Sequence, residues 1–153
     1  ADAPVIVTHR RRMFEDMGTN DQAILDQQDV LFDTWLRERL ANGRYGGWLA
    51  EDAAGNVVAG AGVWLLDWPP GPSSFAPYRG YILNVYTEPA FRRRGLAGRL
   101  VQACVDWCRA QGIVVVSLHA SDQGRPVYVS LGFAPTNEMR LRWPVTPAPR
   151  PSA

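Results

Sequence analysis

The chain has 153 residues, of which 46% are hydrophobic, and a formal net charge of +1 at pH 7. This composition suits one compact domain with a real core, and the near-neutral charge gives no broad electrostatic case for nucleic acid or a membrane as a partner. No apolar run reaches the roughly 18 residues of a membrane span and no secretory signal precedes Ala1, so we expect a cytoplasmic protein.

The first part of the chain predicts two helices. Residues 2–17 have a helical pattern with Asp2 as a candidate N-cap, and Gly18 ends it. A second helical pattern covers Asp21 to Leu40 and stops at Asn42 and Gly43. Together these segments predict a pair of helices ahead of the first strand.

An antiparallel meander is expected next. Residues 48–51 and 57–66 read as strands joined by a short turn that contains Gly55. Residues 67–78 are too rich in proline and glycine for regular structure, and a loop of this length in a compact domain is often functional.

The middle of the chain predicts a β-α-β unit. In residues 81–87 successive side chains alternate between two faces, which predicts a strand. In residues 95–112 the apolar residues recur at helical spacing, and residues 113–118 are a short apolar run that predicts a second strand. A connection of this kind makes the two strands parallel and the crossover right-handed. A ligand groove is therefore expected at the carboxyl ends of these strands.

An anion site is predicted where the first of these strands passes to the helix. Residues 92–99, Arg-Arg-Arg-Gly-Leu-Ala-Gly-Arg, place positive charge and small residues at the start of a helix, where unpaired N–H groups and the helix dipole favour a phosphate. A Walker loop is excluded because the chain contains no lysine. A dinucleotide-binding fingerprint is weak, because the strand of residues 113–118 ends in His119 rather than an acidic residue.

The last third predicts a short helix and a final strand. Asp122 is a candidate cap for a helix that runs to Leu131, and residues 138–143 read as a strand. Residues 144–153 are rich in proline and are expected to be extended or disordered. The predicted organisation is one domain over residues 1–143 with a proline-rich tail over residues 144–153.

The anion loop carries a resemblance to a known family. Arg92, Gly95 and Ala97 match the pattern Arg/Gln-x-x-Gly-x-Gly/Ala, and residues 85–91 and 121–133 look like the approach loop and last helix around it. In these features the chain resembles the GCN5-related N-acetyltransferase (GNAT) superfamily. The resemblance covers roughly residues 1–143.

This resemblance implies a mixed α/β (α+β) fold and acetyl-coenzyme A as cosubstrate, with no metal. The sheet would combine antiparallel N-terminal strands with a parallel strand-helix-strand unit, flanked by helices, and the family's first strand is expected to be missing because the chain enters a helix at once. The residues expected to bind the coenzyme are Val85, Tyr86, Thr87, Arg92, Arg93, Arg94, Gly95, Leu96, Ala97, Gly98 and Ser121.

The resemblance also suggests a catalytic acid. Acetyl transfer from a thioester to an amine needs a group that protonates the departing thiolate, and the family places a tyrosine at the position of Tyr128. The alternative is an amphipathic core tyrosine. The general base stays open: Glu88, His119 and water are weighed, and other candidates follow from elements that would border the acceptor pocket, namely Glu15, Asp67 and Glu138.

Three functions from different classes are compatible with these sequence features. The leading hypothesis is an N-acetyltransferase that works by direct transfer in a ternary complex, because Cys104 and Cys108 read as core thiols rather than nucleophiles. The others are a non-catalytic acyl-coenzyme A binding module and an arginine-rich nucleic-acid binder, which ranks last because it lacks interleaved aromatic residues.

The acceptor is expected to be a small-molecule or peptide amine, and a homodimer is compatible with the family. The run from Arg10 to Arg12 would suit an acidic group on an acceptor, although a solvated helix face is the commoner role of such a run.

Overall fold

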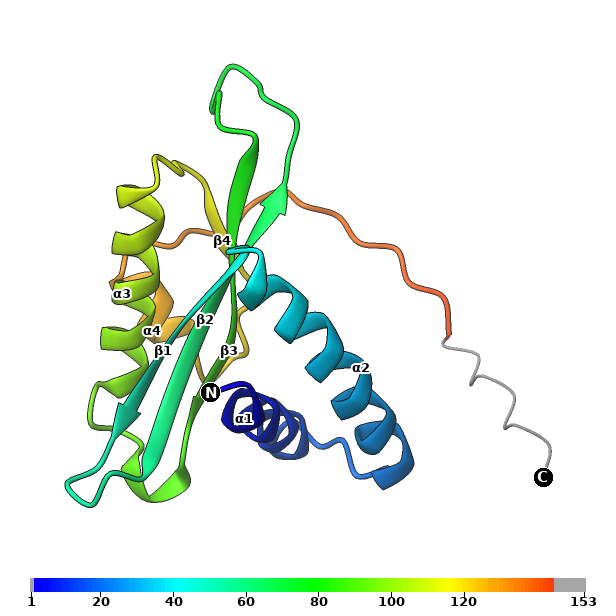
Figure 1. The fold of residues 1–153 in the computed structure, drawn as a ribbon. Coiled ribbons are helices and arrows are strands. Elements are labelled where there is room, and N and C mark those ends of the chain that lie inside the picture. Colours follow the sequence, from blue (N-terminus) through cyan, green and yellow to red (C-terminus); the bar gives the residue numbers. More distant parts are fainter. Residues whose placement is uncertain (1, 145–153) are drawn as a thin grey trace.

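The computed structural model describes residues 2–144 as a four-stranded sheet with helices on both faces (Figure 1). In chain order the elements are α1 (Ala3–Asp16), α2 (Gln22–Ala41), β1 (Tyr45–Glu51), β2 (Val57–Asp67), β3 (Tyr78–Thr87), the short 3-10 helix η1 (Pro89–Phe91), α3 (Leu96–Ala110), β4 (Val116–Leu118) and α4 (Arg125–Ser130).

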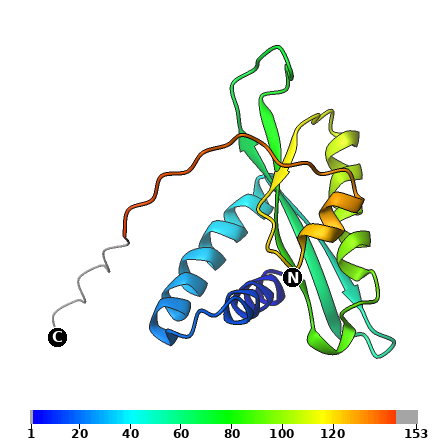
Figure 2. The same ribbon diagram turned by 180° about the vertical axis from the view of Figure 1, so that it is seen from behind.

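The sheet is mixed and has the strand order β1-β2-β3-β4. β1, β2 and β3 form an antiparallel meander, whereas β3 and β4 run parallel and are connected through α3. Helices α1 and α2 lie on one face of the sheet, and α3 and α4 lie on the other (Figures 1 and 2). The predicted fold class is therefore confirmed, and among the described residues no strand precedes α1.

The N-caps observed at the helix starts agree only in part with those predicted from the sequence. Asp21 caps α2, since its Oδ1 accepts hydrogen bonds from the backbone N–H of Ala23 at 3.0 Å and of Ile24 at 3.2 Å. Asp2 is the N-cap residue of α1, as predicted, but its backbone is helical (φ −94°, ψ −5°) and its side chain makes no capping bond. Asp122 does not cap α4, because Ser121 provides the hydrogen bond at that turn.

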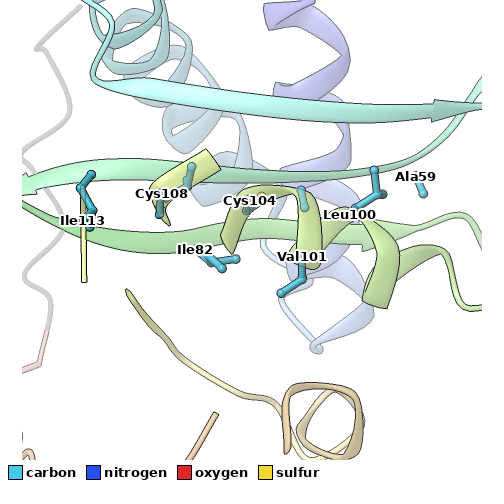
Figure 3. Packing of buried hydrophobic residues seen from close by; sticks show 9 residues of the cluster. Ala59, Ile82, Leu100, Val101, Cys104, Cys108 and Ile113 are labelled. Atoms are coloured by element: carbon cyan, nitrogen blue, oxygen red, sulfur yellow. The ribbon is translucent and has the colours of Figure 1, made fainter. Parts of the chain in front are cut away.

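The main core lies between α3 and the sheet. Leu100, Val101, Cys104 and Cys108 form the buried stripe of α3, and Figure 3 shows them beside Ala59, Ile82 and Ile113. Both thiols are free and fully buried, and burial raises the pKa of Cys104 to about 12 and that of Cys108 to about 11. The prediction of core thiols is confirmed, and neither cysteine is a reactive nucleophile near neutral pH.

The C-terminal part departs from the prediction. Residues 138–143 do not form a strand, and β4 is limited to Val116–Leu118. Met139 is 95% exposed, and Leu141 and Trp143 are also exposed. The alternation of apolar residues fits a strand. A stable strand also needs hydrogen bonds to a neighbouring strand and one face packed against other residues, and this segment has neither among the described residues. The predicted tail from residue 145 onward lies outside the described residues.

A prediction concerns the close approach of α3 to β3. A Cβ atom on Gly80 would lie 2.7 Å from the Cys108 sulfur, so Gly80→Ala should lower the free energy of unfolding by about 1–3 kcal/mol through overpacking. The decrease is measured by urea denaturation of the wild type, each single variant and the double variant Gly80→Ala/Cys108→Ala. Removing the sulfur should relieve the clash, so the double variant should lose less than the two single losses combined; strict additivity would contradict this packing argument.

Candidate active site

The edge of β3 that faces β4 is only partly paired. The parallel ladder joins Gly80 with Val116, Tyr81 with Ser117 and Ile82 with Leu118. β3 continues to Thr87, and beyond Ile82 this edge has no strand partner among the described residues. Backbone N–H and C=O groups without partners need another source of hydrogen bonds. The Thr87 carbonyl accepts a hydrogen bond from Arg92, and the rest of the edge over residues 83–87, which includes the predicted Val85 and Tyr86, can bind an extended ligand that carries amide groups.

A bulge distorts β3 at the same place. Gly60 pairs with Tyr86 and Gly62 pairs with Leu83, so Ala61 of β2 faces two residues of β3 rather than one. Asn84 is one of these two, and it has the left-handed backbone angle φ = 57°. Asparagine tolerates this conformation better than most residues do.

The side chain of Asn84 is buried in a polar network below the bulge. Its Oδ1 accepts a hydrogen bond from Arg10 Nη1 at 2.7 Å, and its Nδ2 donates to the Tyr45 hydroxyl at 2.9 Å. Gly62 makes room for this network, because a Cβ there would lie 1.9 Å from the Tyr45 oxygen. The sequence does not predict this network, because its members come from α1, β1 and β3 and no local pattern connects them.

The predicted anion loop follows β3 and ends at the start of α3. Arg93 (φ 62°) and Gly95 (φ 74°) both adopt the left-handed conformation, and the helix begins at Leu96. Backbone N–H groups in such a turn and in the first helical turn form a concave site for an anion. Arg99 N–H bonds to the Gly95 carbonyl, so the helical ladder starts directly behind this site. The arrangement fits a pyrophosphate group.

The three arginines of the loop have different surroundings. Arg92 donates from Nε to the Thr87 carbonyl at 2.9 Å and pairs with Asp16 at the end of α1. Arg94 donates to the Ala90 carbonyl at 3.0 Å and lies over the Phe91 ring. Arg93 is exposed and makes no side-chain hydrogen bond or ion pair with the described residues. Arg92 and Arg94 therefore brace the loop, and the Arg93 guanidinium is free for an anion.

Helix α4 packs close to the first turn of α3. A Cβ on Gly98 would make ordinary van der Waals contact with Val127 at 3.6 Å, so α4 lies directly against this turn. Ser121 lies before α4, and its Oγ accepts a hydrogen bond from the Gly124 N–H at 3.1 Å. These contacts place α4 on the α3 side of the sheet, beside the anion loop (Figure 2).

Tyr128 lies on α4 and is half-buried. Its ring packs edge-on against Phe133 at 6.1 Å and belongs to the border of the main core. Burial raises the pKa of the Tyr128 hydroxyl, so the group is protonated at neutral pH and can donate a proton. Its hydroxyl makes no hydrogen bond with the described residues, which leaves the proton available for a ligand.

The two candidate bases lie in different environments. Glu88 pairs with Arg12, and its Oε1 is 4.0 Å from Nε2 of the buried His9. His119 is exposed beside Tyr81, with ring centroids 5.6 Å apart, and desolvation followed by the nearby Arg140 charge lowers its pKa. Glu88 is thus engaged in holding α1 to β3, while His119 remains open to solvent.

Comparison with known proteins assigns the family. The sequence of residues 10–133 matches the model of the acetyltransferase (GNAT) family. The chain belongs to the GNAT family. The GNAT structure from Ralstonia eutropha is 37% identical, with a TM-score of 0.84 over 93% of this chain and 92% of that one. An acetyltransferase from Clostridium acetobutylicum, solved with acetyl-CoA, is 31% identical, with a TM-score of 0.83 over 92% of this chain and 90% of that one.

A more distant structure shares the GNAT fold alone. Glucosamine-6-phosphate N-acetyltransferase from Arabidopsis thaliana is 20% identical over 75% of this chain and 78% of that one, with a TM-score of 0.63. A search of curated proteins found no match. Acetyl transfer from acetyl-CoA is general for the GNAT family, and the unpaired edge of β3 and the loop before α3 provide the types of group that such a cosubstrate needs.

Two negative findings complete the description of this GNAT protein. None of the helices in residues 2–144 is both long enough and apolar enough to cross a lipid bilayer. Over the same part of the chain, His, Cys, Asp and Glu side chains do not gather in groups of three or more that could hold a metal ion.

A second prediction tests the bulge. Asn84→Ala and Asn84→Gly both remove the hydrogen bonds to Arg10 and Tyr45, but glycine keeps easy access to positive φ. The alanine variant should therefore be less stable than the glycine variant by about 1 kcal/mol, the cost of a left-handed residue with a Cβ. Urea denaturation of both variants measures the difference, and equal stabilities would mean that the backbone at residue 84 relaxes without cost.

Proposed function

We propose that the protein is an N-acetyltransferase that transfers the acetyl group of acetyl-CoA directly to a primary amine in a ternary complex. The observation that supports this most is the combination of an unpaired β3 edge over residues 83–87 and a left-handed loop that opens α3. In this proposal the edge binds the pantetheine arm through Val85, Tyr86 and Thr87. The loop binds the pyrophosphate through the segment from Arg92 to Gly98, and Ser121, at the turn before α4, contributes a further contact to the coenzyme.

The proposed chemistry uses one addition and one elimination. The neutral amine attacks the thioester carbonyl carbon and forms the C–N bond, while a backbone N–H beside the bulge stabilises the oxyanion. The C–S bond then breaks, and the thiolate takes the proton of the Tyr128 hydroxyl. The ammonium proton leaves to water, and the tyrosinate regains a proton from solvent. The net products are an amide, free coenzyme A and an unchanged protein.

Direct transfer is supported by the state of the cysteines. Cys104 and Cys108 are fully buried, and burial raises the pKa of each thiol, so neither can carry an acetyl group during turnover. The absence of lysine from the chain also removes side-chain amines as sites of self-acetylation. Intact-mass analysis can therefore separate transfer to an added amine from labelling of the protein.

Cosubstrate binding is tested by thermal unfolding. Acetyl-CoA should raise the midpoint, because a ligand at about 100 times its dissociation constant adds roughly 2.7 kcal/mol to the native state. S-acetylpantetheine, which lacks the pyrophosphate, should raise it less. Arg93→Gln should reduce the response to acetyl-CoA, whereas the control Arg109→Gln, at the far end of α3, should not. No response in the wild type would contradict the proposed site.

The role of Tyr128 is tested by Tyr128→Phe. Removing the hydroxyl should lower kcat by about 10²–10⁴-fold, the usual contribution of a general acid, and should leave the thermal response to acetyl-CoA nearly unchanged. Coenzyme A release in the presence of a panel of amines measures kcat. Tyr78→Phe, at the distant start of β3, is the matched control. An unchanged rate in Tyr128→Phe would remove this residue from the mechanism, and binding without transfer to any amine would favour a non-catalytic acyl-CoA module.

A further inference from the structure

Arg10 is enclosed in a way that is unusual for a charged residue on a helix of the outer layer. Its guanidinium carbon lies 4.4 Å from the centre of the Phe32 ring and 4.9 Å from that of Phe14. Nη1 donates to Asn84, while Nε is buried and has no partner among the described residues. Burial lowers the pKa of Arg10 from its usual range but leaves it charged at neutral pH.

Arg10 lacks the carboxylate partners that the neighbouring arginines of α1 have. Arg11 pairs with Glu15, Asp26 and Asp29, and Arg12 pairs with Glu88. Arg10 pairs with no carboxylate in residues 2–144, and the remainder of the sequence contains no Asp or Glu. A charge that is partly removed from water without a counter-ion is costly, and Arg10 is such a half-buried, uncompensated charge. The sequence-based expectation of a solvated helix face for this run was therefore wrong for Arg10.

The Arg10 guanidinium lies near the strand that is proposed to hold the thioester. Asn84, which binds Arg10, directly precedes Val85 on the edge of β3. Arg10 contacts Phe14 of α1, Phe32 of α2 and Asn84 of β3. Helices α1 and α2 lie on one face of the sheet, and α3 lies on the opposite face (Figure 1). The guanidinium is thus separate from the proposed pyrophosphate site but close to the strand that would hold the thioester. A group bound there would belong to the acceptor rather than to the coenzyme.

We infer that Arg10 recognises an anionic group on the acceptor, so that the preferred substrate is an amine that also carries a carboxylate or a phosphate. This inference rests on the proposed function. The planar guanidinium contacts two aromatic rings, its Nη1 is held by Asn84 and its Nε is buried, so Nη2 is the group that would donate to an oxygen of such an anion. Asn84 sets the direction of Nη2 by holding Nη1.

Matched pairs of amines test the inference. The pairs are phenylalanine with phenylalaninamide, 4-aminobutyrate with 4-aminobutyramide, and 2-aminoethyl phosphate with ethanolamine, and coenzyme A release gives kcat/KM for each. In the wild type at least one anionic member should exceed its neutral partner by about tenfold or more, the effect of a charged hydrogen bond. The carboxylate and phosphate pairs then show which anion is preferred.

Substitution of Arg10 assigns the preference to this residue. Arg10→Gln should bring the ratio within a pair close to one. Both members of a pair use the same site, so any effect of the lost Asn84 hydrogen bond on acetyl-CoA binding cancels in this ratio. Arg10→Lys should restore part of the ratio because it keeps the charge. Arg37→Gln, which removes an exposed arginine paired with Asp33 on α2, should leave the ratio unchanged.

A binding measurement separates this inference from the proposed function. Ligand-observed NMR with N-acetylphenylalanine, N-acetyl-4-aminobutyrate and N-acetyl-2-aminoethyl phosphate, each against its neutral counterpart in the presence of coenzyme A, does not require turnover. Anion-dependent binding that is lost in Arg10→Gln supports the site even if no amine is acetylated, which would then count against the enzyme alone. Transfer with equal kcat/KM in every pair, a preference that persists in Arg10→Gln, or the absence of any anion-dependent signal would overturn it.

Discussion

Asn84 holds a backbone conformation that most residues avoid, and elements distant in the sequence keep it there. The side chain is fixed from α1 by Arg10 and from β1 by Tyr45, while the glycine at position 62 of β2 leaves space for the tyrosine hydroxyl. The bulge interrupts the ladder with β2 just where β3 extends beyond its pairing with β4. Strain at one buried residue therefore shapes the strand edge on which the proposed ligand contacts depend.

Helix α1 acts as a brace for this region rather than as a simple cover. Arg12 pairs with Glu88 after β3, and Asp16 pairs with Arg92 at the start of the anion loop. Each such ion pair near the surface contributes only about 0–1 kcal/mol. Their position matters more than their energy, because they join the first residue of the β3-to-α3 connection and the start of the anion loop to the same helix. The two faces of the sheet differ in what they hold. Helices α3 and α4 lie beside the anion loop, whereas α1 and α2 supply the residues around Arg10.

The order of the elements and the anion loop could be predicted from the sequence. Helical and alternating patterns gave the two N-terminal helices, the meander and the β-α-β unit because burial of one face imposes a period of 3.6 or 2.0 on apolar residues. The small residues at positions 95, 97 and 98 marked the helix start because only small side chains leave backbone N–H groups accessible. Cys104 and Cys108 were assigned to the core by the same helical period.

The tertiary structure decided what depends on long-range contacts. Residues 138–143 have a strand pattern, yet whether such a segment pairs depends on a neighbouring edge that no local pattern describes. The three arginines of α1 are adjacent in sequence and look alike, but a helix turns each successive residue by about 100°. One of them therefore reaches the bulge and two aromatic rings, while the other two meet carboxylates. The sequence alone predicted an anion site beside α3. Only the packing of α1 and α2 on the sheet placed a second positive charge, which has no paired carboxylate in residues 2–144, beside the same strand.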